Sequence, residues 1–172
     1  MPTMLILRGK AGKYPDEQGN IYNYTDGALH EGAALKYAER RKYTGQVLPV
    51  AGLAKENSEQ TNKALEKFRE TGSDITAFYG FSAGGLNLKH ILDEMTPDEL
   101  VLIKLLVVVG APENPPTKYQ PSNYGDKDHV PKWELVYKTN PSPTAPFVPK
   151  GAGPHMFGPE WLLWELDNPK KK

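Results

Sequence analysis

The sequence predicts an α/β fold, a three-layer sandwich with a mainly parallel sheet of about five strands and helices on both faces. Short apolar runs alternate along the chain with amphipathic helical patterns, which is typical of βαβ units. The apolar runs are continuous rather than alternating, as expected for strands that are covered on both faces. At 172 residues the chain can bury about 70% of its unfolded surface in one core. We therefore expect one domain over residues 1–168, followed by a basic tail at 169–172.

The first half of the chain contains two predicted strands and two predicted helices. Residues 4–7 are predicted to form the first strand, which a glycine-rich loop and a polar segment to Asp26 follow. A helical pattern covers residues 27–43, and we expect Gly45 to close that helix. Residues 46–51 form the next predicted strand. Asn57 and Ser58 are expected to open a second helix, which ends near Gly72.

The second half continues the alternation. Residues 74–79 predict a strand and the residues after it a helix, because Leu88, Ile91, Leu92 and Met95 share one helical face. Thr96-Pro97-Asp98-Glu99 combines an N-cap, a first-turn proline and a capping-box glutamate, so another helix is expected there. Further predictions are strands over 104–109 and 133–138, a final helix over 161–166, and irregular proline-rich segments over 113–128 and 140–154.

Composition limits the classes of partner. The 21 acidic residues balance the 21 lysines and arginines, which argues against binding to nucleic acid. The chain has no cysteine, so nothing requires an oxidising compartment. The apolar run at residues 1–7 is too short for the core of a signal peptide and lacks its basic start. The longest apolar stretch, residues 101–109, cannot span a bilayer. We therefore predict a cytoplasmic protein with no membrane span and no cofactor.

The segment Gly80-Phe81-Ser82-Ala83-Gly84 joins the third predicted strand to its helix. A Gly-x-Ser-x-Gly sequence between a strand and a helix is typical of a nucleophile elbow, in which a strained turn presents the serine hydroxyl above the sheet. Side chains at Gly80 and Gly84 would collide with the neighbouring strand or helix. Ser82 is therefore the candidate nucleophile.

A serine nucleophile needs a base, and that base needs an orienting acid. His155, in a glycine-rich loop before the last helix, is the predicted base, with His129 in reserve; His30 and His90 fall in helical patterns and are expected to be partly exposed surface residues. Asp128 is the first choice for the acid, because it lies between Ser82 and His155 in the Ser…Asp…His order. Asp126 and Glu113 are the alternatives. Asp126, Asp128 and His129 form only a weak metal pattern, so no metal is predicted.

The oxyanion hole requires two backbone N–H groups that point at the developing charge. We expect one from Ala83, directly after the nucleophile, and the other from Lys10, in the loop after the first strand. The aromatic residues expected to line the site, or else to serve in ordinary packing, are Tyr14, Tyr22, Tyr24, Phe81 and Phe157.

Four segments together resemble the cutinase-like branch of the α/β-hydrolases: Ile6–Lys10, Gly80–Gly84, Val109–Pro112 and Pro154–Gly158. This resemblance implies a compact, five-stranded and lidless serine esterase that forms an acyl-enzyme on Ser82 with His155 as base. The substrate would be a small-molecule ester. Two features depart from that family: the chain lacks cysteines, and Thr139-Asn140-Pro141-Ser142 has no carboxylate where the family's acid follows the last strand.

Two other functions fit the sequence. A catalytically inactive α/β-hydrolase-fold protein could bind a partner through its Tyr- and Pro-rich loops, and the missing carboxylate favours it. A different doubly wound enzyme could bind phosphate at Arg8-Gly9-Lys10-Ala11-Gly12, although that loop matches neither Gly-x-x-x-x-Gly-Lys-Ser/Thr nor Gly-x-Gly-x-x-Gly. The oligomeric state is open.

Overall fold

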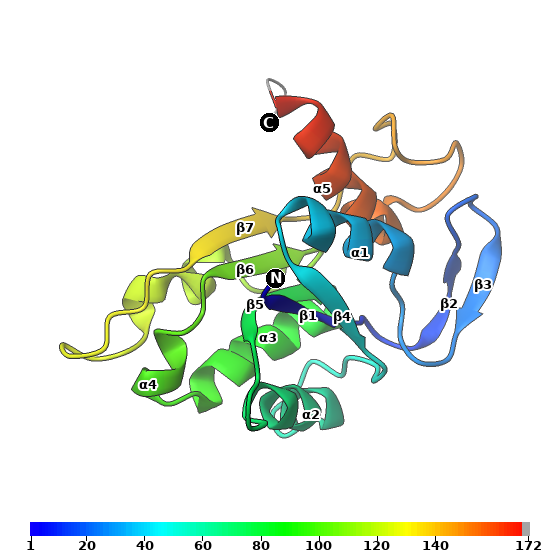
Figure 1. Cartoon of the computed structure of the whole chain (residues 1–172). Helices are drawn as coiled ribbons and strands as arrows, with labels where there is room; N and C mark the ends of the chain where they lie inside the picture. Colours follow the sequence, from blue (N-terminus) through cyan, green and yellow to red (C-terminus); the bar gives the residue numbers. More distant parts are fainter. Residues whose placement is uncertain (170–172) are drawn as a thin grey trace.

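A computed structural model of the protein describes residues 1–169, so the tail predicted at 169–172 lies outside the described residues except for Pro169. Five parallel strands form the central sheet in the order β4-β1-β5-β6-β7 (Figure 1). Their bounds are β1 (Thr3–Leu7), β4 (Thr44–Leu48), β5 (Ile75–Phe81), β6 (Leu105–Val109) and β7 (Glu134–Lys138). The predicted α/β fold with a five-stranded parallel sheet is confirmed.

Helices cover both faces of the sheet (Figure 1). One face carries α1 (Glu31–Arg40) and α5 (Gly158–Asp167), and the other carries α2 (Glu59–Phe68), α3 (Ala83–Glu94) and the single turn α4 (Pro97–Leu100). Three short 3₁₀ helices lie in the loops: η1 (Pro116–Tyr119), η2 (Pro121–Asn123) and η3 (Pro154–Phe157). Because the strands are parallel, the loops that follow β1, β5, β6 and β7 all meet at one edge of the sheet, where ligands bind in such folds.

The helix starts predicted at Ser58 and Thr96 are confirmed, whereas the helices predicted from residues 27 and 161 begin at Glu31 and Gly158. Ser58 caps α2 by accepting a hydrogen bond from the Thr61 N–H, and Thr96 and Glu99 form the capping box of α4. The prediction for Gly45 is wrong, because this residue lies inside β4. Lys42, with φ 70°, makes the left-handed turn after α1 instead. Gly45 is needed for another reason: a Cβ there would lie 2.8 Å from Leu35 Cδ2, so its small size lets α1 pack closely on β4.

An antiparallel hairpin, β2 (Gly12–Pro15) and β3 (Ile21–Tyr24), lies in the segment for which the sequence predicted only a polar loop. It projects beside α1 and the segment that leads into α5 (Figure 1). The hairpin escaped prediction because none of its residues is fully buried, so no buried apolar face imposes a period-two pattern on the sequence.

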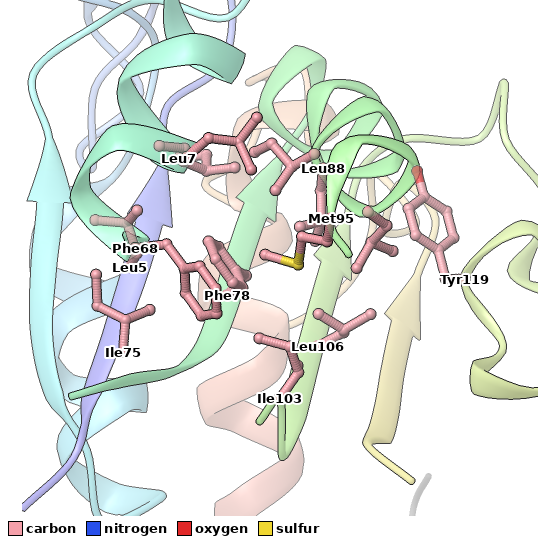
Figure 2. Close-up of a cluster of buried hydrophobic side chains, with 14 of the residues drawn as sticks. Leu5, Leu7, Phe68, Ile75, Phe78, Leu88, Met95, Ile103, Leu106 and Tyr119 are labelled. Atoms are coloured by element: carbon pink, nitrogen blue, oxygen red, sulfur yellow. The ribbon is translucent and has the colours of Figure 1, made fainter. Parts of the chain in front are cut away.

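The larger core lies between the sheet and the layer of α2 and α3. Figure 2 shows side chains from β1, β5 and β6 meeting those of the two helices, with Phe78 and Leu106 near the middle. Phe78, Leu88 and Leu106 are fully buried. No helix within residues 1–169 is long and apolar enough to cross a membrane.

Replacing Leu106 by alanine should lower the free energy of unfolding by about 2–5 kcal/mol, because the lost methyl groups leave a cavity in a fully buried site. Urea unfolding followed by circular dichroism measures this change. Leu102→Ala is the matched control, since Leu102 is 52% exposed and its replacement should change the same quantity by less than about 0.5 kcal/mol. Equal losses in the two variants would contradict the assignment of Leu106 to the core.

Candidate active site

Ser82 occupies the turn between β5 and α3 with φ 55° and ψ −120°. A non-glycine residue with this backbone conformation costs about 1–3 kcal/mol and persists only where its surroundings enforce it. Two glycines make the turn possible. A Cβ on Gly80 would lie 2.7 Å from the Gly84 carbonyl oxygen, and one on Gly84 would lie 2.5 Å from the Leu7 carbonyl oxygen. The strained strand-turn-helix geometry predicted for this segment is therefore present, with glycines at the two positions that have no room for a Cβ.

Hydrogen bonds fix the turn from both sides. The Ser82 N–H donates to the Val109 carbonyl oxygen at the end of β6, at 2.9 Å. The Ser82 carbonyl oxygen accepts from the Gly85 and Leu86 N–H groups at 2.9 and 3.2 Å, which begins α3. With its backbone held in this way, the half-buried Ser82 can direct its hydroxyl toward the loops at the carboxyl edge of the sheet.

His155 meets Ser82, as predicted. Its Nε2 lies 2.8 Å from Ser82 Oγ, within hydrogen-bond distance. The ring stacks on Phe81, with centroids 5.2 Å apart and planes 29° from parallel. Burial lowers the pKa of His155, which favours the neutral ring that a general base requires.

Asn140 holds the other side of the imidazole. His155 Nδ1 lies 2.7 Å from Asn140 Oδ1, a carbonyl oxygen that can only accept a hydrogen bond. Nδ1 must therefore carry the proton, which leaves the Nε2 lone pair to accept the Ser82 hydroxyl. Gly110, with φ 73°, lies beneath both residues: a Cβ there would be 3.2 Å from His155 Cε1 and 3.5 Å from Asn140 Oδ1.

Asp128 was predicted to orient His155, and the structure places it elsewhere. It lies exposed in the loop before β7, where its N–H donates to Asp126 Oδ1 at 2.9 Å. A loop that precedes a strand of a parallel sheet lies at the amino edge, whereas Ser82 and His155 lie at the carboxyl edge. The reserve base His129 is at the same distant edge, 2.9 Å from Asp126 and 2.7 Å from Asp98. Asn140 therefore replaces Asp128 as the partner of His155.

The sequence did not predict Asn140 as the partner of His155, because a carboxylate was expected in that role. A positional signal was available: Asn140 comes two residues after β7 ends at Lys138, where a loop returns to the carboxyl edge of the sheet. That rule would also have excluded Asp126 and Asp128, which precede the strand. The alternative Glu113 does follow β6, but the partner of His155 Nδ1 is Asn140.

The two backbone groups predicted for an oxyanion hole are free. Within residues 1–169, neither the Ala83 N–H nor the Lys10 N–H donates a hydrogen bond. The loop that carries Lys10 passes close to the nucleophile, because a Cβ on Gly9 would lie 3.2 Å from Ser82 Cβ. A developing oxyanion needs unused backbone donors, and these two belong to the serine turn and to a loop that contacts it.

Gln60, on α2, fixes the loops that surround these donors. Its fully buried Nε2 donates to the carbonyl oxygens of Arg8 and Val50, both at 2.8 Å. Its Oε1 accepts from Asn87 Nδ2, on α3, at 2.9 Å. Gln60 therefore joins the ends of β1 and β4 to the helix that follows the nucleophile, and all its polar atoms are satisfied.

His30 was expected on the surface, but it is 1% exposed. Its Nδ1 lies 2.8 Å from Glu160 Oε2, and its Nε2 lies 3.1 Å from the Pro15 carbonyl oxygen, so both nitrogens face acceptors. Burial by itself would lower the pKa of His30, but the hydrogen bonds to Glu160 and the Pro15 carbonyl raise that pKa overall. Burial raises the pKa of Glu160, because its effect exceeds the lowering that the contact with His30 causes. The pair ties the hairpin to the segment that carries His155.

The aromatic residues considered as lining serve mainly in packing. Phe81 supports His155, and Phe157 lies edge-on to His30 with ring centroids 4.8 Å apart. Tyr22 packs edge-on against Tyr24 at 4.9 Å, and Tyr14 lies 6.3 Å from Tyr24. The described part of the chain contains no group of three His, Asp or Glu residues that could hold a metal ion.

No protein-family model matches the sequence, and no curated protein matches it either. The geometry of these residues is therefore the basis on which a function can be assigned.

Replacing Gln60 by leucine should lower the free energy of unfolding by about 2–4 kcal/mol, because it leaves buried polar groups of Arg8, Val50 and Asn87 without their partner. Urea unfolding measures the loss, and amide hydrogen exchange should become faster at residues 8–10 and 50–52. Lys63→Leu, on the exposed face of the same helix, is the control and should change neither quantity. Unchanged exchange in the loops of Gln60→Leu would show that Gln60 does not hold them.

Proposed function

We propose that the protein is a serine hydrolase of the α/β-hydrolase kind that cleaves small carboxylic esters through an acyl-enzyme on Ser82. The observation that carries the proposal is the relay of two hydrogen bonds, Ser82 Oγ to His155 Nε2 at 2.8 Å and His155 Nδ1 to Asn140 Oδ1 at 2.7 Å. The strained turn at Ser82 and the free N–H groups of Ala83 and Lys10 support it. Nucleophile, base, orienting residue and oxyanion donors therefore meet at one edge of the sheet.

In the proposed mechanism, Ser82 Oγ attacks the ester carbonyl carbon while its proton moves to His155 Nε2. The carbonyl oxygen becomes negative and accepts hydrogen bonds from the Ala83 and Lys10 N–H groups. As the tetrahedral intermediate collapses, His155 gives the proton to the leaving alcohol, and the acyl group stays on Ser82. A water molecule then attacks the acyl-enzyme, with the same histidine as base, and releases the acid and the free serine.

The proposed triad has a neutral residue, Asn140, in the position where a carboxylate orients the base of other serine hydrolases. A carboxylate in its place would orient the imidazole and also stabilise the imidazolium that forms in the transition state. The neutral amide of Asn140 supplies the orientation alone, as the asparagine does in Cys-His-Asn sites. We expect a modest turnover rate and a base that remains neutral at mildly acidic pH.

The same neutral residue favours a second candidate function, a binding protein on this fold that does not turn over substrate. In that case the hydrogen bonds of Ser82 and His155 would be structural. Reactivity of the serine decides between the two functions, since only a catalytic arrangement activates the hydroxyl.

Treatment with a fluorophosphonate should add one phosphonyl group to the protein, because Ser82 Oγ forms the bond to phosphorus while fluoride leaves and His155 takes the proton. Intact-mass spectrometry detects the adduct. Ser82→Ala should remain unlabelled, whereas Ser122→Ala, which removes an exposed serine elsewhere, should be labelled like the wild type. A folded wild type that takes up no label would favour the binding protein.

Replacing Asn140 by aspartate should raise the pKa of His155, since a carboxylate beside Nδ1 stabilises the charged ring. The base must be neutral to act, so the acid limb of kcat/KM against pH should move to higher pH in Asn140→Asp. For the wild type the limb should lie below the ordinary histidine value, because burial lowers this pKa. Hydrolysis of p-nitrophenyl acetate across pH 5–9 measures both profiles.

At pH values above that limb, Asn140→Asp should turn over about tenfold faster or more, because the carboxylate stabilises the imidazolium of the transition state. The control is Asn140→Ala, which removes the acceptor and should slow turnover without moving the limb upward. An acid limb at the same pH in all three proteins would mean that residue 140 does not act on His155.

A further inference from the structure

The strand β7 forms a free edge of the sheet. In the described part of the chain, residues 1–169, its only neighbouring strand is β6, which binds it through the backbone groups of every second residue. The Glu134 N–H donates to the Lys104 carbonyl oxygen at 3.0 Å, and the Lys138 carbonyl oxygen accepts from the Gly110 N–H at 2.8 Å. In a parallel ladder this register turns the N–H and C=O groups of the alternate residues, Leu135 and Tyr137, away from β6. Within residues 1–169, these backbone groups have no partner beyond the edge.

The sequence of β7 complements itself when it is reversed. It reads Glu134-Leu135-Val136-Tyr137-Lys138, with a negative residue at one end, a positive residue at the other and three apolar or aromatic residues between. If two copies of this strand run antiparallel about Val136, each Glu134 faces a Lys138, and each Leu135 faces a Tyr137. Opposite charges and apolar pairs at facing positions stabilise antiparallel strands.

Hydrogen bonding selects the same register. Leu135 and Tyr137 are the residues whose backbone groups point outward, and pairing about Val136 sets these two residues opposite each other. They would exchange both N–H···O bonds, while Val136 would face its own copy in a non-hydrogen-bonded pair on the two-fold axis. We propose that β7 pairs antiparallel with β7 of a second copy of this chain, which joins the two sheets into one.

The ion pairs that Glu134 and Lys138 make within one chain are compatible with the proposed pairing of two chains. Glu134 already pairs with Arg41 at 2.7 Å, and Lys138 pairs with Glu165 and lies 5.0 Å from the centre of the Trp161 ring. Pairing of two copies would bring Glu134 of one to Lys138 of the other, so the charges would alternate in sign from Arg41 to Glu165. Glu134 is 59% exposed in the single chain and is free to make this second contact.

A cavity of about 300 Å³ lies along the same edge, between the strand and the two helices α1 and α5. Its lining includes apolar or aromatic side chains (Val136, Tyr37, Leu162) and charged ones (Arg41, Glu134, Glu165). The second copy would cover the half-buried Val136 and close this space from outside.

The opposite edge strand, β4, does not offer the same pairing. It reads Thr44-Gly45-Gln46-Val47-Leu48, so it has no charged residue at either end and does not complement itself when reversed.

Five residues a side make a small interface, so the dimer should dissociate in the micromolar range. Sedimentation velocity over that concentration range should show wild-type protein passing from monomer to dimer. Glu134→Lys should raise the dissociation constant about tenfold, because it sets two positive side chains opposite each other on both sides of the axis. Glu39→Lys makes the same change of charge on an exposed position of α1 and should leave the constant unchanged.

A cross-link tests the register directly. The chain has no cysteine, so Val136→Cys introduces one thiol per chain, and the proposed pairing brings two of them together on the axis. Mild oxidation should give a disulfide-linked dimer much faster than with Gln46→Cys, at the centre of the other edge strand. A wild type that stays monomeric would overturn the proposal, as would equal cross-linking of the two variants or a dimer that Glu134→Lys does not weaken. None of these results depends on hydrolase activity.

Discussion

The strained backbone of Ser82 is the constraint to which the other parts of the site are fitted. A φ of 55° at a residue with a side chain is held because α3 begins very close to both β5 and β1: a Cβ on Gly80 would collide with the Gly84 carbonyl oxygen, and a Cβ on Gly84 would collide with that of Leu7. The same close approach sets Gly84 against the carbonyl oxygens at the end of β1. The loop after β1 is thereby brought to the nucleophile, and this is why a second backbone donor lies near Ser82 at all.

The remaining site residues are held by contacts that come from far along the chain. Phe81 supports the His155 ring from below, and Asn140 fixes its tautomer from the side. The buried His30–Glu160 pair anchors the segment on which His155 sits, and Gln60 anchors the loops beside Ala83 and Lys10. These contacts come from the sheet, from the loop after β7 and from helices on both faces. The geometry of the site is therefore a property of all three layers.

The neutral residue beside the base separates two tasks that a carboxylate performs together. Asn140 can hold Nδ1–H and so define which nitrogen accepts the serine proton, but it adds no charge to balance the imidazolium. Burial acts on the same histidine in the same sense, because it also disfavours the charged ring. The proposed enzyme would accordingly be suited to reactions with good leaving groups, which need the least help from the charged form of the base.

The sequence by itself determined the fold class and the strained turn at Ser82, and it singled out His155 as the histidine to pair with that serine. Gly80, Ser82 and Gly84 lie within five residues, and Ser58 and Thr96 cap helices within their own turns, so short stretches of sequence predict these features. Tertiary structure decided the partner of His155, because the loops that carry Asn140 and Asp128 lie at opposite edges of the sheet. It also decided that His30 is buried, since its acceptors come from Pro15 and Glu160, and that Gly45 serves packing rather than a helix end. These outcomes depend on contacts between distant segments, which local patterns do not encode.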